Sequence, residues 1–248
     1  MNFAYVCFVN YNTKYIELMK TTILSVLNFS KYPIIVYCID FPLFEIQQTS
    51  SDNEQLIYRF INDISLSNIH YFKPYVIDDA LKQGLQAGYY IESDDVITPF
   101  ADDFLRSKLP LIFNIPLSPI HITDIMIPEQ DMIKGSCIKK TQHYTHGHVL
   151  FTKQCSLFIH QWLQLCISTT YSFRNADETV LNIMYWKYNC ENHYLPVIDP
   201  WYLNFYLLSF DASFKPSTKS ICSFHGCKNP IMQYQLYLDM MKVDWKAV

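Results

Sequence analysis

The stretch Gly88-Tyr-Tyr-Ile-Glu-Ser-Asp-Asp-Val-Ile97 is the part of the sequence from which a fold and a site can be predicted. Residues 89–91 are apolar and rich in β-formers, so they predict a short buried strand. Three carboxylates, those of Glu92, Asp94 and Asp95, follow directly and repel one another unless a cation neutralises them. Glu92 and Asp94 stand two residues apart, which directs both to one side of an extended chain and suits Mg²⁺ or Mn²⁺. A solvated acidic turn explains the same residues, and the stretch alone leaves both readings open.

Composition bounds the class of protein. The 248 residues are enough for one large domain or two small ones, and the 50% hydrophobic content allows a sizeable core. The net charge of −4 comes without a basic block, so we expect no nucleic-acid partner. No apolar run reaches the roughly 18 residues of a membrane span. The N-terminus shows neither a basic region nor a cleavage site, so we expect no secretory signal and a cytoplasmic protein.

The eight cysteines are scattered, often within apolar runs, and no Cys-x-x-Cys pair occurs. In the absence of a secretory signal they predict buried thiols in a reducing compartment. Cys222, His225 and Cys227 lie close in sequence, but their spacing matches no usual zinc finger and a fourth ligand is missing. We therefore do not expect a zinc site.

The beginning of the chain predicts a strand, a helix and a second strand. Residues 3–9 form an apolar run, and residues 15–27 repeat apolar side chains at helical spacing after a turn at residues 10–13. A second apolar run occupies residues 34–39. Two non-alternating strands around a helix predict a βαβ unit with a parallel sheet. The unit has no Gly-x-Gly-x-x-Gly, which argues against a dinucleotide-binding site.

The rest of the chain predicts further helices and short strands. Helices are expected at residues 54–64, from 73 to near 88, and at 154–167, 176–188 and 231–241, and strands at 111–115 and 149–151. Residues 116–148 lack clear periodicity, and a long irregular stretch within a compact domain is usually functional or mobile. No internal repeat or domain linker is visible.

The order of these pieces resembles the GT-A glycosyltransferases, and most closely the retaining enzymes of the glycogenin and galactinol-synthase type, glycosyltransferase family 8. The resemblance covers most of the chain. It implies an α/β fold with a central, mostly parallel, Rossmann-like sheet flanked by helices in a single domain, residues 1–248. Residues 1–115 are then the nucleotide-binding half. Residues 116–248 are the acceptor side and carry the C-terminal metal and phosphate segment.

Two motifs of the resemblance concern the metal and the diphosphate. Residues 88–97, with the acidic pair at 102–103, look like the family's Tyr-Leu-Asp-Ala-Asp metal motif, so Glu92 and Asp94 take the two carboxylate positions. Glu92 stands where the family usually has Asp. The segment His225-Gly-Cys-Lys228 looks like a compressed form of the family's His-x-x-Gly-x-x-Lys-Pro. The resemblance implies that His225 is the third metal ligand and that Gly226 and Lys228 bind the diphosphate.

Two further motifs concern the sugar. Thr145-His-Gly-His-Val-Leu-Phe151 resembles the family's Asn-Ser/Ala-Gly-Val segment, which borders the sugar, and this makes Gly147 a donor-binding candidate. Thr145 and His146 replace the family's Asn and small residue. Asp177-Glu-Thr-Val-Leu-Asn182 is similar to the family's Asp-Gln-x-x-Leu-Asn helix start beside the reacting carbon. The resemblance makes Asp177 and Glu178 the candidate catalytic residues.

The nucleotide candidates lie earlier in the chain. The turn after the first strand falls where the family binds the base and ribose, so Asn10, Tyr11 and Thr13 are candidates for this role. Lys73, which with Pro74 begins a predicted helix, is a further cofactor-binding candidate.

The resemblance implies the transfer of a sugar from a nucleotide-diphosphate sugar, UDP-linked, to a hydroxyl of a glycan, protein or small molecule, with retention of configuration. A divalent ion, Mn²⁺ or Mg²⁺, would stabilise the leaving diphosphate as a Lewis acid, and Lys228 would add a cation where charge develops. Asp177 and Glu178 would orient the sugar or stabilise positive charge at its anomeric carbon.

Each candidate also has a structural explanation, and these alternatives stay open. Asp177 and Glu178 favour the dipole of the helix they begin, His225 suits an ordinary turn, and Lys228 suits a solvated surface. A catalytically degenerate or non-catalytic carbohydrate- or nucleotide-binding protein of the same fold is the alternative function. A sugar nucleotidyltransferase is disfavoured, because the loop after the first strand lacks a Gly-rich, basic signature. The sequence names neither the donor sugar, nor the acceptor, nor the oligomeric state.

Overall fold

The computed structural model divides the chain into two compact units that interleave along the sequence. The first unit comprises Met1–Asn2, Ser65–Tyr90 and Ile112–Val197, and the second comprises Phe3–Ile64, Ile91–Leu111 and Ile198–Val248. The structure describes residues 2–42, 53–62, 64, 66–109, 114–119, 121–122, 143–144, 148–168, 176–187, 194–195, 221–223 and 229–242. The proposed halves, residues 1–115 and 116–248, remain a prediction.

Three parallel strands form the core of the second unit. β1 (Phe3–Asn10), β2 (Ile34–Ile39) and β3 (Leu56–Ile61) pair in the order β3-β2-β1. All six residues of β2 are buried, as expected of a strand covered on both faces. The helix α1 (Thr13–Phe29) joins β1 to β2, and the Asn12 side chain caps it by accepting a hydrogen bond from Lys14 N. The predicted βαβ unit is therefore confirmed.

The helix predicted at residues 54–64 is wrong, because this segment contains the strand β3. Its residues pair with β2 in continuous register, from Ile34 opposite Leu56 to Ile39 opposite Ile61. The apolar positions of this short run fit a helix and a strand equally well, and periodicity alone cannot separate them. The run is rich in β-branched and aromatic residues, and pairing with a fully buried neighbour decides in favour of the strand.

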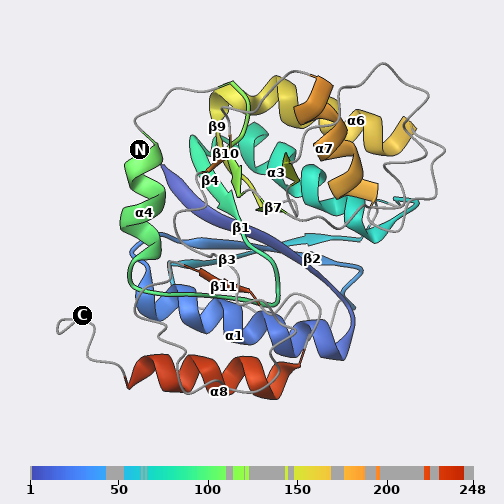
Figure 1. Cartoon of the computed structure of the whole chain (residues 1–248). Helices are drawn as coiled ribbons and strands as arrows, with labels where there is room; N and C mark the ends of the chain where they lie inside the picture. The colour runs from blue at the N-terminus through green and yellow to red at the C-terminus, as the bar shows by residue number, and fades with distance from the viewer. Residues whose placement is uncertain are drawn as a thin grey trace. The chain divides into compact units, whose positions relative to one another are not determined.

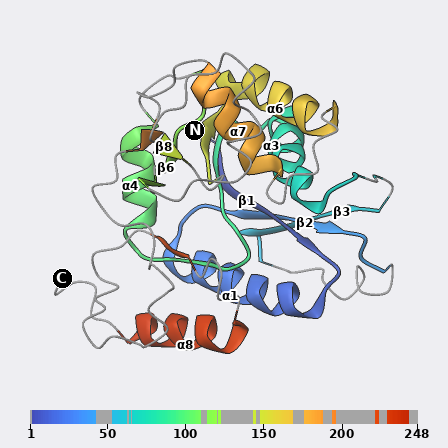
Figure 2. The ribbon, with the colours of Figure 1, turned by 45° about the vertical axis from the view of Figure 1, so that its right-hand side comes forward.

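In the part that the structure describes, the second unit contains four further elements, β5 (Asp95–Ile97), α4 (Ala101–Lys108), β11 (Ile221–Ser223) and α8 (Pro230–Met241). Of these, β5 and α8 contact α1. β11 pairs antiparallel with β5, and α8 lies alongside α1 (Figures 1 and 2). Val96 of β5 is buried with Leu236, Tyr237 and Met240 of α8. The sequence did not predict α4, whereas α8 confirms the predicted C-terminal helix.

The buried carboxylate of Asp102 fixes the first turn of α4 within the second unit. It accepts hydrogen bonds from Tyr5 Oη (2.9 Å), Ser30 Oγ (2.8 Å) and Lys31 N (3.0 Å). The neighbouring Asp103 is exposed. The acidic pair at residues 102–103 thus contains one structural carboxylate and one surface carboxylate.

The first unit contains three packed helices and several short strands. The helices are α3 (Phe72–Lys82), preceded by the 3₁₀ turn η1 (Ile69–Tyr71), α6 (Ser156–Ser168), preceded by η2 (Lys153–Cys155), and α7 (Ala176–Lys187). α6 contacts both α3 and α7 (Figures 1 and 2). The strands are β4 (Ala87–Tyr90), β6 (Ser118–Pro119), β7 (His121–Ile122), β8 (His143–Tyr144), β9 (Leu150–Thr152) and β10 (Tyr194–Leu195).

Pairing in this unit joins distant segments. β4 pairs antiparallel with β9, β6 pairs parallel with β10, and β7 pairs antiparallel with β8. The strand predicted at residues 111–115 lies mostly outside the described residues, and residues 114 and 115 form a bend. The other predicted elements of this unit are confirmed, apart from the end of α3.

The helix α3 ends at Lys82 rather than near Gly88. Gly84 has φ +98°, a left-handed conformation that glycine adopts without strain. Leu85 N donates to Ala80 O and Gly84 N donates to Leu81 O, both at 3.1 Å. These are the two hydrogen bonds of a Schellman motif, which terminates a helix. Gly84 was therefore the stop signal in the sequence.

The fold is α/β, as predicted, with parallel strands in the second unit and helices packed on one another in both units. In the part of the chain that the structure describes, no helix has both the length and the apolar character needed to cross a bilayer.

Candidate functional site

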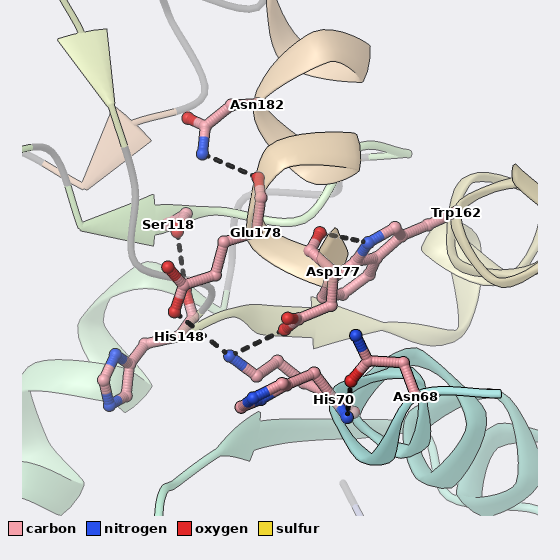
Figure 3. Close-up of polar contacts among 9 residues, drawn as sticks. Asn68, His70, Ser118, His148, Trp162, Asp177, Glu178 and Asn182 are labelled. Carbon is pink, nitrogen blue, oxygen red and sulfur yellow. Dashed lines mark hydrogen bonds and ion pairs between the residues drawn. The ribbon is translucent and has the colours of Figure 1, made fainter. Parts of the chain in front are cut away.

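The structure brings Lys73, Asp177 and Glu178 together in the first unit. Lys73 Nζ lies 3.0 Å from Asp177 Oδ2 and 3.7 Å from Glu178 Oε1. The three residues are 3%, 1% and 6% exposed. Lys73 comes from the first turn of α3 and the two acids from the first turn of α7. We call this group the lysine–carboxylate cluster, and Figure 3 labels its two acids, Asp177 and Glu178.

Neighbouring side chains fix the start of α7. Trp162 of α6 is fully buried, and its indole Nε1 donates a hydrogen bond to Asp177 O at 2.8 Å. Asn182 Nδ2 donates to Glu178 O at 2.8 Å, one turn back along the helix (Figure 3). The Lys73 ammonium also lies 5.4 Å from the ring centroid of Tyr90, at the end of β4. The backbone that carries the two acidic side chains is thereby held by hydrogen bonds from buried side chains.

Charged groups are expensive to bury unless they are paired, and in the cluster a single ammonium lies beside both carboxylates and can compensate only one negative charge. The same charges act on Cys166 of α6. Burial raises the pKa of the Cys166 thiol well above its ordinary value, the Asp177 charge raises it further, and Lys73 lowers it. The acids at the start of α7 therefore do more than favour its helix dipole, because they form a desolvated ionic group.

The strand segment beside the cluster contributes a buried histidine. His148 precedes β9 and is buried, with its ring stacked at a centroid distance of 6.3 Å on Tyr89. Its backbone oxygen accepts a hydrogen bond from the Ser118 hydroxyl (Figure 3). The sugar-binding candidate Gly147, the residue before it, lies outside the described residues, so its role remains a prediction.

The acidic turn, Glu92 to Asp95, lies in the second unit. Asp95 is fully buried, and its Oδ2 accepts a hydrogen bond from Glu92 N at 2.8 Å, which closes the turn. Asp94 is buried and Glu92 half-buried. Asp95 therefore has a structural role within the turn. This leaves the predicted pair, Glu92 and Asp94, as the carboxylates to consider for a cation.

The C-terminal segment of the predicted metal site falls largely outside the described residues, which exclude His225, Gly226 and Lys228. The strand before it is described, and Ser223 of β11 pairs with Asp95 of β5. Among the described residues, no group of three His, Cys, Asp or Glu side chains could hold a metal ion. The metal ligands and the diphosphate-binding residues thus stay predictions.

The turn that follows β1 carries the nucleotide candidates. Tyr11 is 46% exposed, and its ring meets that of Phe41 edge to face at 5.3 Å. Tyr11 N donates to Ile39 O, so the turn lies at the carboxyl ends of the parallel strands β1 and β2. This is the edge at which open α/β sheets bind ligands. Asn10 and Thr13 lie at the end of β1 and the start of α1.

Comparison with known proteins shows similarity in structure without similarity in sequence. No model of a protein family matches the chain, and no curated protein matches it. The apo form of the glycosyltransferase GlyE from Streptococcus pneumoniae TIGR4 has a TM-score of 0.62 and 15% identity, over 98% of this chain and 61% of the GlyE chain. A second GlyE structure gives a TM-score of 0.60 and 14% identity with the same coverage. This chain thus spans about three fifths of the length of GlyE.

A galactosyltransferase, LgtC in complex with donor and acceptor sugar analogs, is similar over nearly its whole length. It has a TM-score of 0.57 and 9% identity, over 98% of this chain and 99% of the LgtC chain. These likenesses confirm the predicted glycosyltransferase fold of the GT-A type. At such low identity they are findings about the fold.

Proposed function

We propose that the protein is a glycosyltransferase that moves a sugar from a UDP-linked donor to a hydroxyl acceptor, with a divalent cation and with retention of configuration. The observation that carries the proposal is the lysine–carboxylate cluster. It lies where the sequence resembles the sugar-side motif of these enzymes, in a chain with their fold. LgtC, which has this fold, is known in complex with donor and acceptor sugar analogs.

The chemistry of the cluster suits glycosyl transfer. Positive charge develops at the anomeric carbon as the bond to the diphosphate breaks, and preorganised carboxylates stabilise such charge most strongly where water is excluded. Asp177 and Glu178 are almost fully buried and are held by Lys73, so they need little reorganisation during the reaction. We assign to them the orientation of the donor sugar and the stabilisation of this charge.

The residues of the second unit fit a divalent cation by their donor chemistry. Glu92 and Asp94 offer carboxylate oxygens, the ligands that Mg²⁺ and Mn²⁺ prefer. His225 lies two residues beyond Ser223, which pairs with Asp95, and two residues span about 7 Å of extended chain at most. We propose these three residues as the ligands. A cation bound there would act as a Lewis acid on the diphosphate, with Lys228 and Gly226 beside it.

The nucleotide itself is assigned to the turn after β1. The half-exposed ring of Tyr11 offers a face for a base, while Asn10 and Thr13 offer polar groups for the ribose. The alternative function is binding without transfer, in a degenerate relative of these enzymes. The Glu at position 92, where the family has Asp, favours this alternative, since the longer arm changes the ligand position.

A thermal-shift titration with UDP, with and without Mn²⁺, tests the proposal. A ligand that binds only the folded state at 100 times its Kd stabilises it by about 2.7 kcal/mol. We expect stabilisation that needs both UDP and Mn²⁺ in the wild type, is lost in Asp94→Ala and persists in the control Asp103→Ala, which changes an exposed acid nearby. The absence of any shift with UDP, other nucleotides or metal would refute the proposal.

A second assay separates transfer from binding. Transferases commonly hydrolyse their donor slowly when no acceptor is present, so we expect Mn²⁺-dependent release of UDP from a UDP-sugar. The release is expected to fall sharply in Asp177→Asn and Glu178→Gln. Binding of UDP and Mn²⁺ without release from any UDP-sugar would favour the non-catalytic alternative.

A further inference from the structure

Two buried polar side chains hold the acidic turn from outside. Thr22 of α1 and Gln233 of α8 are both fully buried in the second unit. Thr22 Oγ1 lies 2.8 Å from Ser93 O and 2.7 Å from Asp95 O. Gln233 Nε2 lies 3.2 Å from each of the same two carbonyl oxygens and 3.2 Å from Thr22 Oγ1. The turn backbone is therefore fixed by two helices that are more than 200 residues apart in sequence.

The donors of this contact match the acceptors that they face, whereas Gln233 Oε1 is buried and has no hydrogen-bond partner among the described residues. The threonine hydroxyl has one proton and the glutamine amide has two, and these face two backbone carbonyl oxygens and the hydroxyl oxygen. The Thr22 hydroxyl can donate to one carbonyl oxygen, while the two amide protons of Gln233 are donated to the other carbonyl oxygen and to the hydroxyl oxygen. An apolar residue at position 22 or 233 would remove donors from buried carbonyls, which is costly and would let the turn adopt other conformations.

The turn is also closed from within. Asp95 Oδ2 accepts a hydrogen bond from Glu92 N, and Asp95 N donates to Glu92 O at 3.2 Å. With Thr22 and Gln233, these contacts fix the backbone on both sides of Asp94. The backbone of each proposed cation ligand in the turn is thus held in place by a neighbouring group.

We propose that Thr22 and Gln233 are positioning residues, which hold the acidic turn of Glu92 and Asp94 in the geometry that binds a divalent cation. The inference rests on the proposed function. Groups that orient metal ligands commonly change metal affinity by 10–100-fold when they are replaced. A residue that only stabilises the fold would lower the melting temperature and leave cation affinity in the folded protein unchanged.

The test measures Mn²⁺ affinity by electron paramagnetic resonance of free Mn²⁺, with saturating UDP and no sugar. Thr22→Val removes a hydroxyl and Gln233→Met removes an amide, each at nearly constant volume. We expect both to raise the Mn²⁺ Kd by about tenfold. Thr22→Ser keeps the hydroxyl and should retain wild-type affinity. The matched control is Gln235→Met, which changes an exposed glutamine of the same helix.

A second readout uses the metal-free protein. Hydrogen exchange of the Glu92 and Asp95 amides, both bonded within the turn, should be faster in Thr22→Val and Gln233→Met than in the wild type. Folded variants with unchanged Mn²⁺ affinity would overturn the inference and leave the proposed function intact. A wild type that binds no Mn²⁺ would overturn both. If Gln233→Met does not fold, the comparison of Thr22→Val with Thr22→Ser decides.

Discussion

Replacing Lys73 by Met should destabilise the protein far more than the loss of a surface lysine. The ammonium lies 3.0 Å from Asp177 and 3.7 Å from Glu178, and all three side chains are almost fully buried. Breaking a buried ion pair from one side costs about 3–5 kcal/mol, since it leaves an uncompensated buried charge. Met preserves most of the aliphatic stem of Lys73, so little of this loss comes from packing. For a chain of this size the loss lowers Tm by about 10 °C.

Thermal and urea unfolding of Lys73→Met measure this loss, with Lys20→Met as the control. Lys20 pairs with Glu17 at 2.6 Å, but their side chains are 61% and 47% exposed, so we expect a loss below about 1 kcal/mol. Neutralising both acids as well, in a triple variant with Asn at position 177 and Gln at position 178, should recover much of the stability. Equal losses for Lys73→Met and Lys20→Met would refute the argument that the cluster is desolvated.

Three further predictions test the structure and the nucleotide assignment. Asp102→Ala should lose about 3 kcal/mol in urea unfolding, because two buried hydroxyl groups and one partly buried backbone N–H lose their acceptor. Asp103→Ala should change stability by less than about 0.5 kcal/mol. Burial raises the pKa of the Cys155 thiol to about 11 and that of the Cys38 thiol to about 12. Because only the thiolate reacts, a thiol-specific reagent at pH 8 should label neither cysteine until the protein unfolds. Detection of either label in the native protein by mass spectrometry would contradict this prediction. Tyr11→Ala should raise the Kd for UDP about tenfold, as expected for the loss of a base-stacking ring, and an unchanged Kd by calorimetry would remove Tyr11 from the nucleotide site.

Local patterns in the sequence predicted most elements of the fold. The fully apolar β2, the amphipathic α1 with its Asn12 cap, and the Pro230 start of α8 each carry a signal within a few residues. The segment 56–61 carries no such local signal, since a short, mostly apolar run of six residues is compatible with both a helix and a strand. Only its pairing with β2, a contact between distant residues, decides its structure.

The candidate site was less predictable, because its contacts join residues that are far apart in sequence. Asp177 and Glu178 are sufficiently explained by the start of a helix, and nothing near Lys73 in the sequence indicates that it pairs with them. The spacing of residues 15–27 placed Thr22 on the apolar face of its helix, but nothing in the sequence indicated its partners. Gln233 carried no signal, since a glutamine on a helix is usually a surface residue. Their roles follow only from the carbonyl groups that the fold places beside them.

The structure separates the acids of residues 92–103 by the groups they bind. A carboxylate that accepts a hydrogen bond from a backbone N–H has a structural role. Asp95 accepts one from Glu92 N, and Asp102 accepts one from Lys31 N. Asp103 is exposed on α4. The metal hypothesis therefore depends on Glu92 and Asp94, the pair whose two-residue spacing first suggested it. Because the neighbouring acids serve to fix the turn and α4, the acidity of this segment does not by itself require a cation. The Mn²⁺ titrations of the Asp94 and Thr22 variants, rather than the count of acids, are what can establish one.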